Sequence, residues 1–165
     1  MIECSMFGYL ERIDGLCSYL RFYDRTDTVA REKIYSNGSR LLTVAVEDEK
    51  MYLVSRSLPD MNKSRISFCS VVQKTLVSTP RGLEGFLSAL GFAFVRENNV
   101  SVVSFLRHPV EVEVSKWKSE DESVDRLHLV KVSVATENVN DGEKILSKVV
   151  EELESQVQLL RPSLK

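Results

Sequence analysis

The feature of this sequence that most constrains its fold is a long series of short segments in which apolar and polar residues alternate. Alternation of this kind is typical of β-strands that bury one face. The predicted strands are Ile2–Tyr9, Val29–Tyr35, Leu41–Glu47, Met51–Ser57, Arg65–Thr75, Phe92–Glu97, Val100–Arg107, Val110–Trp117 and Leu127–Ala135. Most are joined by connections of hairpin length, and strands joined in this way pair antiparallel. The series therefore predicts a mainly antiparallel sheet of about nine strands.

Turn signals separate these strands. Ser36–Ser39, with the letters SNGS, is a strong turn signal, and Glu47–Lys50 and Asn98–Asn99 predict tight hairpins. The polar stretch Ser119–Ser123 predicts a solvated loop. Several strands, such as Ile2–Tyr9, carry apolar residues on both faces, so we expect one face to pack on helices and the other to line an interior. A closed or nearly closed β-barrel with helices outside satisfies this pattern and leaves no exposed strand edge.

Three segments have the period of an α-helix: Leu10–Tyr23, Thr79–Gly91 and, at the end, about Asp141–Leu160. In the central one, Thr79 is placed to cap the N-terminus, Pro80 fits the first helical position, and Gly91 suits a left-handed end. Its apolar stripe consists of Leu83, Phe86, Leu87 and Leu90. We expect this stripe to pack on the barrel wall, with Glu84 and Ser88 outside. A stripe open to solvent would instead mark the place where a partner helix docks.

Composition limits the class of protein. The chain has 165 residues, of which 43% are hydrophobic and 28% charged, as expected for one globular domain that spans 1–165. Together with the predicted elements, this gives an α+β class in which a barrel is flanked by three helices. The net charge is −2, and there is no block of like charges. Binding to nucleic acid needs a concentrated basic face, so we expect no direct nucleic-acid partner.

The three cysteines, Cys4, Cys17 and Cys69, are odd in number and widely spaced, which argues against a disulfide framework and a CxxC metal site. Each lies in a run with apolar periodicity, so we expect buried free thiols and a reducing compartment. No apolar run approaches the length of a membrane span, and Glu3 stands where a signal peptide would carry positive charge. We therefore expect a soluble, intracellular protein with no membrane partner.

The residues that could carry chemistry are few. Of the two histidines, His108 precedes Pro109 at a strand break and His128 lies on the same strand face as Val130, so both have simple structural explanations. The sequence has no GxSxG segment and no Gly-rich phosphate loop. We therefore predict no catalytic residue, no metal ligand and no cofactor.

One pair of carboxylates offers an alternative. Glu111 and Glu113 project to the same face of a strand, and inside a barrel they could hold a divalent cation. The segment resembles the ExExK strand of the triphosphate tunnel enzymes, antiparallel barrels that hydrolyse triphosphates with a metal. Lys116 comes one residue late for that motif, the motif should open the chain, and we expect no inward Arg and Lys for a triphosphate. The simpler interpretation is an outward-facing acidic edge beside Trp117.

Three segments, in order, resemble Mediator complex subunit 18, a head-module subunit of the RNA polymerase II coactivator. Met1–Glu11, followed by the leucine-containing stretch Ile13–Leu20, is similar to that family's first strand and helix. Leu83–Phe94 resembles its central helix, which ends in Gly and an aromatic residue. Leu127–Thr136, followed by a long helix and a tail with leucine and proline, is similar to the family's end.

The resemblance implies a non-enzymatic scaffold that acts in transcription regulation in the nucleus through protein contacts. It also implies a heterodimer with Mediator subunit 20, a related barrel, and docking of the C-terminal helix of subunit 8, with RNA polymerase II contacted indirectly. The alternative is a tunnel-type, metal-dependent triphosphatase that uses Glu111 and Glu113. A third interpretation is a barrel that binds a small apolar ligand.

Candidate partner-binding residues follow from residue type. Trp117, Phe105 and Tyr52 are large side chains on strands, and aromatic residues are enriched at interface hot spots. The competing interpretation places all three in the core, since large apolar side chains are usually buried.

Overall fold

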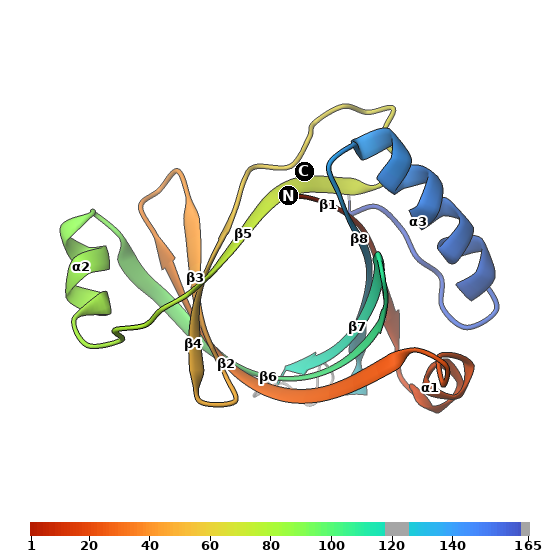
Figure 1. Ribbon diagram of the computed structural model, residues 1–165, viewed down its shortest axis with the longest axis horizontal. Helices are drawn as coiled ribbons and strands as arrows, with labels where there is room; N and C mark the ends of the chain where they lie inside the picture. Colours follow the sequence, from red (N-terminus) through yellow and green to blue (C-terminus); the bar gives the residue numbers. More distant parts are fainter. Residues whose placement is uncertain (118–125, 163–165) are drawn as a thin grey trace.

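The computed structural model describes residues 1–117 and 126–162, and the predicted loop Ser119–Ser123 lies outside them. Eight strands form a closed antiparallel barrel in the order β1-β5-β4-β3-β2-β6-β7-β8 (Figure 1). The strands are β1 (Ile2–Leu10), β2 (Asp24–Ser36), β3 (Leu41–Glu47), β4 (Lys50–Arg56), β5 (Phe68–Leu76), β6 (Ala93–Arg107), β7 (Val110–Trp117) and β8 (His128–Thr136). The helices are α1 (Asp14–Tyr19), α2 (Leu83–Ala89) and α3 (Val139–Leu153). The predicted class, an antiparallel barrel flanked by three helices, is confirmed.

The strand count differs from the prediction at one place. Asn98 and Asn99 do not form a hairpin turn, because they pair with Glu32 and Arg31 inside the long ladder between β2 and β6. That ladder runs from Asp24 to Ser36, so β2 begins before the predicted start at Val29. A continuous partner strand therefore overrides the local turn preference of two asparagines.

The main hydrophobic core lies outside the barrel wall. Val130, Val132 and Val134 of β8 are fully buried and belong to one cluster with Leu146 and Leu153 of α3. Figure 1 shows α3 and α1 outside the ring of strands, on the side of β1, β7 and β8, whereas α2 lies on the opposite side. The outer face of the barrel is thus its apolar face.

After α3, the segment up to Leu160 runs beside β1 instead of continuing the helix. Helix α3 ends at Leu153, earlier than the predicted Leu160. The amide and carbonyl of Leu160 bond with those of Phe7 at 2.8 and 2.9 Å, which places the tail along β1. A Cβ atom at Gly8 would lie 2.4 Å from the Gln158 carbonyl oxygen. Glycine at this position therefore permits the close approach of the tail backbone.

Among the helices that the structure describes, none combines the length and the hydropathy needed to cross a membrane.

Candidate functional site

The interior of the barrel is lined by charged side chains. On β7, Val110, Val112 and Val114 are buried in the outer core, so the alternating Glu111 and Glu113 face the interior. The prediction of an outward acidic edge is therefore wrong. The reason is that the helices cover the outer wall, which makes the outside the apolar face and leaves the inside to the polar residues.

A lysine on the neighbouring strand binds two of the interior carboxylates. Lys131 of β8 lies directly opposite Glu113, and its Nζ donates to Glu113 Oε2 at 2.8 Å and to Glu3 Oε2 at 3.1 Å. The Arg56 guanidinium reaches across β5 and donates to Glu3 Oε1 at 2.6 Å. Contrary to our expectation, the barrel therefore supplies inward Lys and Arg side chains.

These contacts change the pKa values of the interior groups. Burial opposes ionisation of Glu3, but the Lys131 and Arg56 charges outweigh it and lower the pKa of Glu3. Burial also opposes the charge of Lys131, yet Glu113 and Glu3 raise the pKa of this ammonium. The charged forms of Glu3 and Lys131 are therefore favoured, and their hydrogen bonds join them to Arg56 and Glu113 in one interior network.

Two further glutamates, Glu32 and Glu111, face the interior, and burial has the largest effect on their pKa values. Burial, together with the carboxylates of Glu113 and Glu47, raises the pKa of Glu32. Burial, together with Glu113, raises the pKa of Glu111. Within residues 1–117 and 126–162, no group of three or more His, Cys, Asp or Glu side chains has the geometry to hold a metal ion.

The second notable feature is helix α2, whose apolar stripe is only partly covered. Leu87 is buried against Tyr35 and Val44, whereas Phe86 is 59% exposed and Leu90 is 54% exposed. The expectation that the whole stripe packs on the barrel wall is therefore wrong. The helix has only seven residues, and its short contact with the wall covers one side of it.

The start of α2 also differs from the prediction. Gly82 is the N-cap, with φ of 84°, and no side chain caps the first turn, so Thr79 does not have the predicted role. The end is as predicted, because Gly91 adopts a left-handed φ of 81°. This glycine turns the chain directly into β6, where Phe94 and Val95 are 55% and 53% exposed.

We call Phe86, Leu90 and Phe94 the α2 surface. Two grooves of about 390 and 400 Å³ flank the helix, and both are lined in part by Lys33, Tyr35 and Glu84. The floor of the first is apolar and consists of Val44, Val46, Met51 and Leu83. The Lys33 ammonium donates to Glu84 Oε1 at 2.6 Å, and the Tyr35 hydroxyl lies 3.3 Å from the same oxygen. The contacts of Glu84 with Lys33 and Tyr35 hold α2 on β2, beside an apolar groove that is open to solvent.

The structure separates the three predicted partner-binding aromatics. Phe105 is 1% exposed and belongs to the outer core, so it is unavailable to a partner. Tyr52 and Trp117 are half-buried; the Lys74 ammonium lies 4.3 Å from the Tyr52 ring centre, and Trp117 ends β7 opposite Val100. Phe86 and Leu90 belong to the stripe that we expected to mark a partner site if it lay open to solvent, whereas Phe94 was not predicted as a partner contact.

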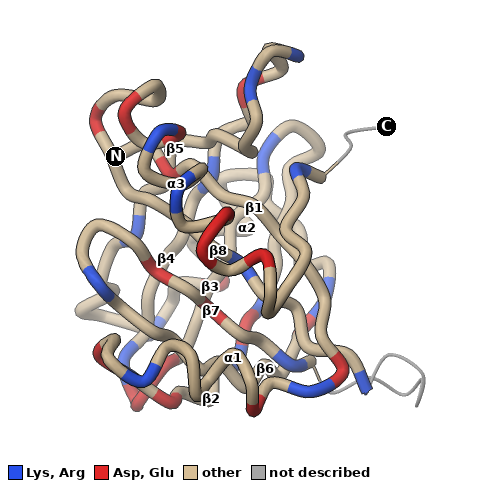
Figure 2. Tube along the Cα trace, turned by 90° about the vertical axis from the view of Figure 1, so that its right-hand side faces the viewer, with Lys and Arg blue, Asp and Glu red and all other residues tan. Residues whose placement is uncertain are grey.

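Charge is distributed without a dominant sign. Figure 2 shows acidic and basic positions interspersed along the described chain. His108 is exposed, and the half-buried His128 has Nδ1 3.3 Å from the Leu10 carbonyl oxygen. The features that distinguish the molecule are thus its charged barrel interior and its α2 surface.

These features define a class of closed eight-stranded antiparallel barrels with external helices. The chain is similar in structure to a chain of the Schizosaccharomyces pombe Mediator head module, with a TM-score of 0.80 and 13% identity, over 99% of this chain and 100% of that one. It is also similar to a Pyrococcus horikoshii protein, with a TM-score of 0.73 and 18% identity, over 98% and 96% of the two chains. A Hippeastrum protein described with a dominant triphosphatase activity aligns with a TM-score of 0.64 and 9% identity, over 99% and 91%.

At these identities the similarity establishes a shared fold. No protein-family model matches the chain, and no curated protein matches it.

Proposed function

We propose that this protein is a non-enzymatic subunit of a Mediator head module, equivalent to subunit 18, that acts in the nucleus as a scaffold in transcription regulation. The observation that carries the proposal is the end-to-end alignment with the Mediator chain, which leaves almost nothing of either chain unmatched. The ordered resemblance of Met1–Glu11, Leu83–Phe94 and Leu127–Thr136 to that subunit supports it independently.

The α2 surface provides a place for such a subunit to bind another. Exposed apolar side chains that gather around one element favour a protein interface. The partners that follow from the proposal are Mediator subunit 20 and the C-terminal helix of subunit 8. The two grooves beside α2 suit an amphipathic helix, which binds by placing its apolar face into a groove.

Co-expression with subunits 20 and 8 of the same organism tests the proposal. We expect a stable complex on size-exclusion chromatography. Phe86→Asp is expected to weaken or abolish it, and Phe22→Asp is the matched control, because Phe22 is 83% exposed beyond α1. Failure to associate with either subunit would refute the proposed function.

A second candidate function, a metal-dependent triphosphatase, is favoured by the inward direction of Glu111 and Glu113. Its weakness is that Lys131 already binds Glu113 and Glu3, so these carboxylates would have to exchange an ammonium for a metal ion. Phosphate release from tripolyphosphate in the presence of Mn²⁺, lost in Glu113→Ala, would support this candidate. Equal phosphate release by wild type and Glu113→Ala would reject it.

A further inference from the structure

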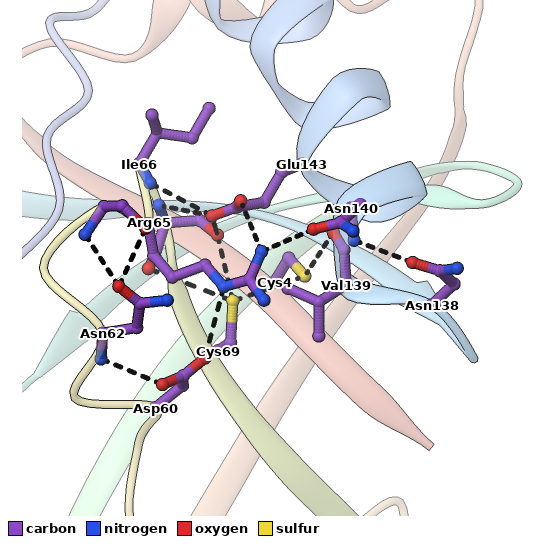
Figure 3. A network of polar contacts seen from close by, with 12 residues as sticks. Cys4, Asp60, Asn62, Arg65, Ile66, Cys69, Asn138, Val139, Asn140 and Glu143 are labelled. Atoms are coloured by element: carbon purple, nitrogen blue, oxygen red, sulfur yellow. Dashed lines mark hydrogen bonds and ion pairs between the residues drawn. The ribbon is translucent and has the colours of Figure 1, made fainter.

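Two cysteines from distant parts of the chain meet at one point of the barrel wall. Cys4 of β1 and Cys69 of β5 are directly opposite each other in the ladder, and their exposed fractions are 0% and 3%. Their Sγ atoms are 3.6 Å apart. Figure 3 shows the two sulfur atoms, with Cys4 beside Val139 at the start of α3 and both below Glu143.

The backbone at this point suits a disulfide. The Val72 amide donates to the Met1 carbonyl at 3.1 Å, so Met1 and Val72 are a hydrogen-bonded pair of the ladder between β1 and β5. Since hydrogen-bonded and non-hydrogen-bonded pairs alternate along an antiparallel ladder, Cys4 and Cys69 form a non-hydrogen-bonded pair. The Cys69 carbonyl accordingly points away from β1 and accepts from the Asp60 amide at 2.8 Å. Cα atoms in such pairs are about 4.5 Å apart, within the range that a disulfide spans.

The location gives the pair a mechanical role. The ladder between β1 and β5 has four register pairs, from Ile2 with Val71 to Ser5 with Phe68, whereas β1 has nine with β8. The β1–β5 contact is therefore a short seam in the closed barrel. We propose that Cys4 and Cys69 are a redox modification site, which a peroxide converts into a disulfide that locks this seam.

The reaction balances with one peroxide per pair. One cysteine, as the thiolate, attacks a peroxide oxygen, and it becomes a sulfenic acid as water leaves. The second sulfur attacks the sulfenic sulfur, which forms the S–S bond and releases a second water molecule. The two thiols lose two electrons and two protons, and hydrogen peroxide is reduced to two molecules of water.

The segment at Ile66 and Ser67, which Glu143 of α3 holds in place, covers the two cysteines and controls their reactivity. We call this segment with Glu143 the cover. Ser67 Oγ lies 3.2 Å from Cys69 Sγ, and the same hydroxyl donates to Glu143 Oε1 at 2.7 Å. That oxygen also accepts from the backbone amides of Ile66 and Ser67, at 3.1 Å each. Burial, with the neighbouring Cys69, raises the pKa of Cys4 to about 12, so Cys4 holds little thiolate in the closed structure. Because Cys4 and Cys69 are 0% and 3% exposed, a peroxide reaches them only when the segment at Ile66 and Ser67 separates from α3.

Peroxide treatment of the reduced full-length protein tests the proposal. Mass spectrometry of the unreduced digest is expected to show a peptide in which Cys4 and Cys69 are joined, with a loss of two hydrogens. The bond closes a loop across a sequence separation of 65, so the midpoint of thermal unfolding should rise by roughly 10 °C. Reductant should reverse the rise.

Matched variants make the outcomes decisive. Cys17→Ala keeps Cys4 and Cys69, so peroxide should raise its unfolding midpoint as in the wild type. Cys69→Ala should show no such rise. Cooperative unfolding of both reduced variants is checked first. Glu143→Gln weakens the cover and should accelerate the linkage several-fold. Absence of the Cys4–Cys69 peptide in both wild type and Glu143→Gln would overturn the proposal, and so would a linked protein without a thermal shift. Linkage in Glu143→Gln alone, with the thermal shift, would support it.

Discussion

Replacing Lys131 with methionine tests whether the barrel interior behaves as a buried environment. The Lys131 side chain is 13% exposed, and its two partners, Glu3 and Glu113, are 18% and 29% exposed. Methionine keeps most of the side-chain volume and removes the charge. The substitution leaves Glu113 without the cation that binds it, while Glu3 keeps Arg56. Removing one partner of a buried ion pair typically costs about 3–5 kcal/mol, since a buried charge is left uncompensated.

We expect a loss near the lower end of that range, about 3 kcal/mol, because Glu113 is partly exposed and Glu3 retains a partner. For a chain of this size the loss corresponds to a fall of roughly 6–12 °C in the unfolding midpoint. Chemical denaturation followed by circular dichroism measures the free energy of unfolding directly. Lys74→Met is the control, because Lys74 is 46% exposed and its pair with Glu47 should contribute about 0–1 kcal/mol.

The pH dependence gives a second test with a defined sign. The folded-state pKa of Glu3 lies below its ordinary value of 4.5, so its pairing stabilises the fold above that value and the stabilisation is lost as the pH falls. The difference between wild type and Lys131→Met should therefore be largest near neutral pH and shrink below about 4.5. Lys131→Met combined with Glu113→Gln should recover part of the loss. Equal losses for Lys131→Met and Lys74→Met at neutral pH would refute the reasoning.

Three further predictions concern other parts of the fold. Glu32→Gln and Glu111→Gln should each stabilise the protein at neutral pH by a few tenths to about 1 kcal/mol. Since the folded pKa of each glutamate is raised, the gain should vanish as the pH falls below the ordinary value of 4.5, in denaturant titrations at several pH values. Gly8→Ala should displace the segment around Gln158 and lower the free energy of unfolding by roughly 1–3 kcal/mol. Hydrogen exchange at the Phe7 and Leu160 amides should become faster, and unchanged exchange would contradict the contact between β1 and this segment. Leu87→Ala should cost about 2–5 kcal/mol, whereas Phe86→Ala should change stability by about 0.5 kcal/mol or less, and equal losses would mean that α2 packs differently.

The sequence predicts which residues of a strand share a face more readily than it predicts which face lines the barrel interior. In β7 the valines and glutamates alternate, so their separation onto two faces follows from the period of two. In an isolated barrel the apolar face would turn inward, but here α1 and α3 cover the wall and the valines turn outward. The covering helices are distant in sequence, so no local pattern could show that Glu111 and Glu113 lie inside.

Which aromatic side chains are buried also depends on which parts of the barrel wall the helices cover. Phe105 and Phe86 both lie in amphipathic segments, yet Phe105 is covered by the outer core and Phe86 is open to solvent. The difference arises because Phe105 belongs to the outer core cluster that contains Leu16 of α1 and Leu146 of α3, whereas the barrel wall buries only one side of the seven-residue α2. Turn chemistry was equally insufficient at Asn98, where the ladder with β2 determined the conformation.

The position of the apolar layer supports the proposed role of α2 in binding a partner. Since the barrel wall carries its core on the outside, every apolar part of the wall needs a covering element. The region of β1, β7 and β8 is covered by α3, by α1 and by the buried tail residues Val157 and Leu159. Among residues 1–117 and 126–162, the element that covers β2, β3 and β4 is the seven-residue helix α2, with an apolar groove beside it. A helix from a partner would extend this outer layer in the same way that α3 does on the other side, which is the arrangement that the proposed scaffold role requires.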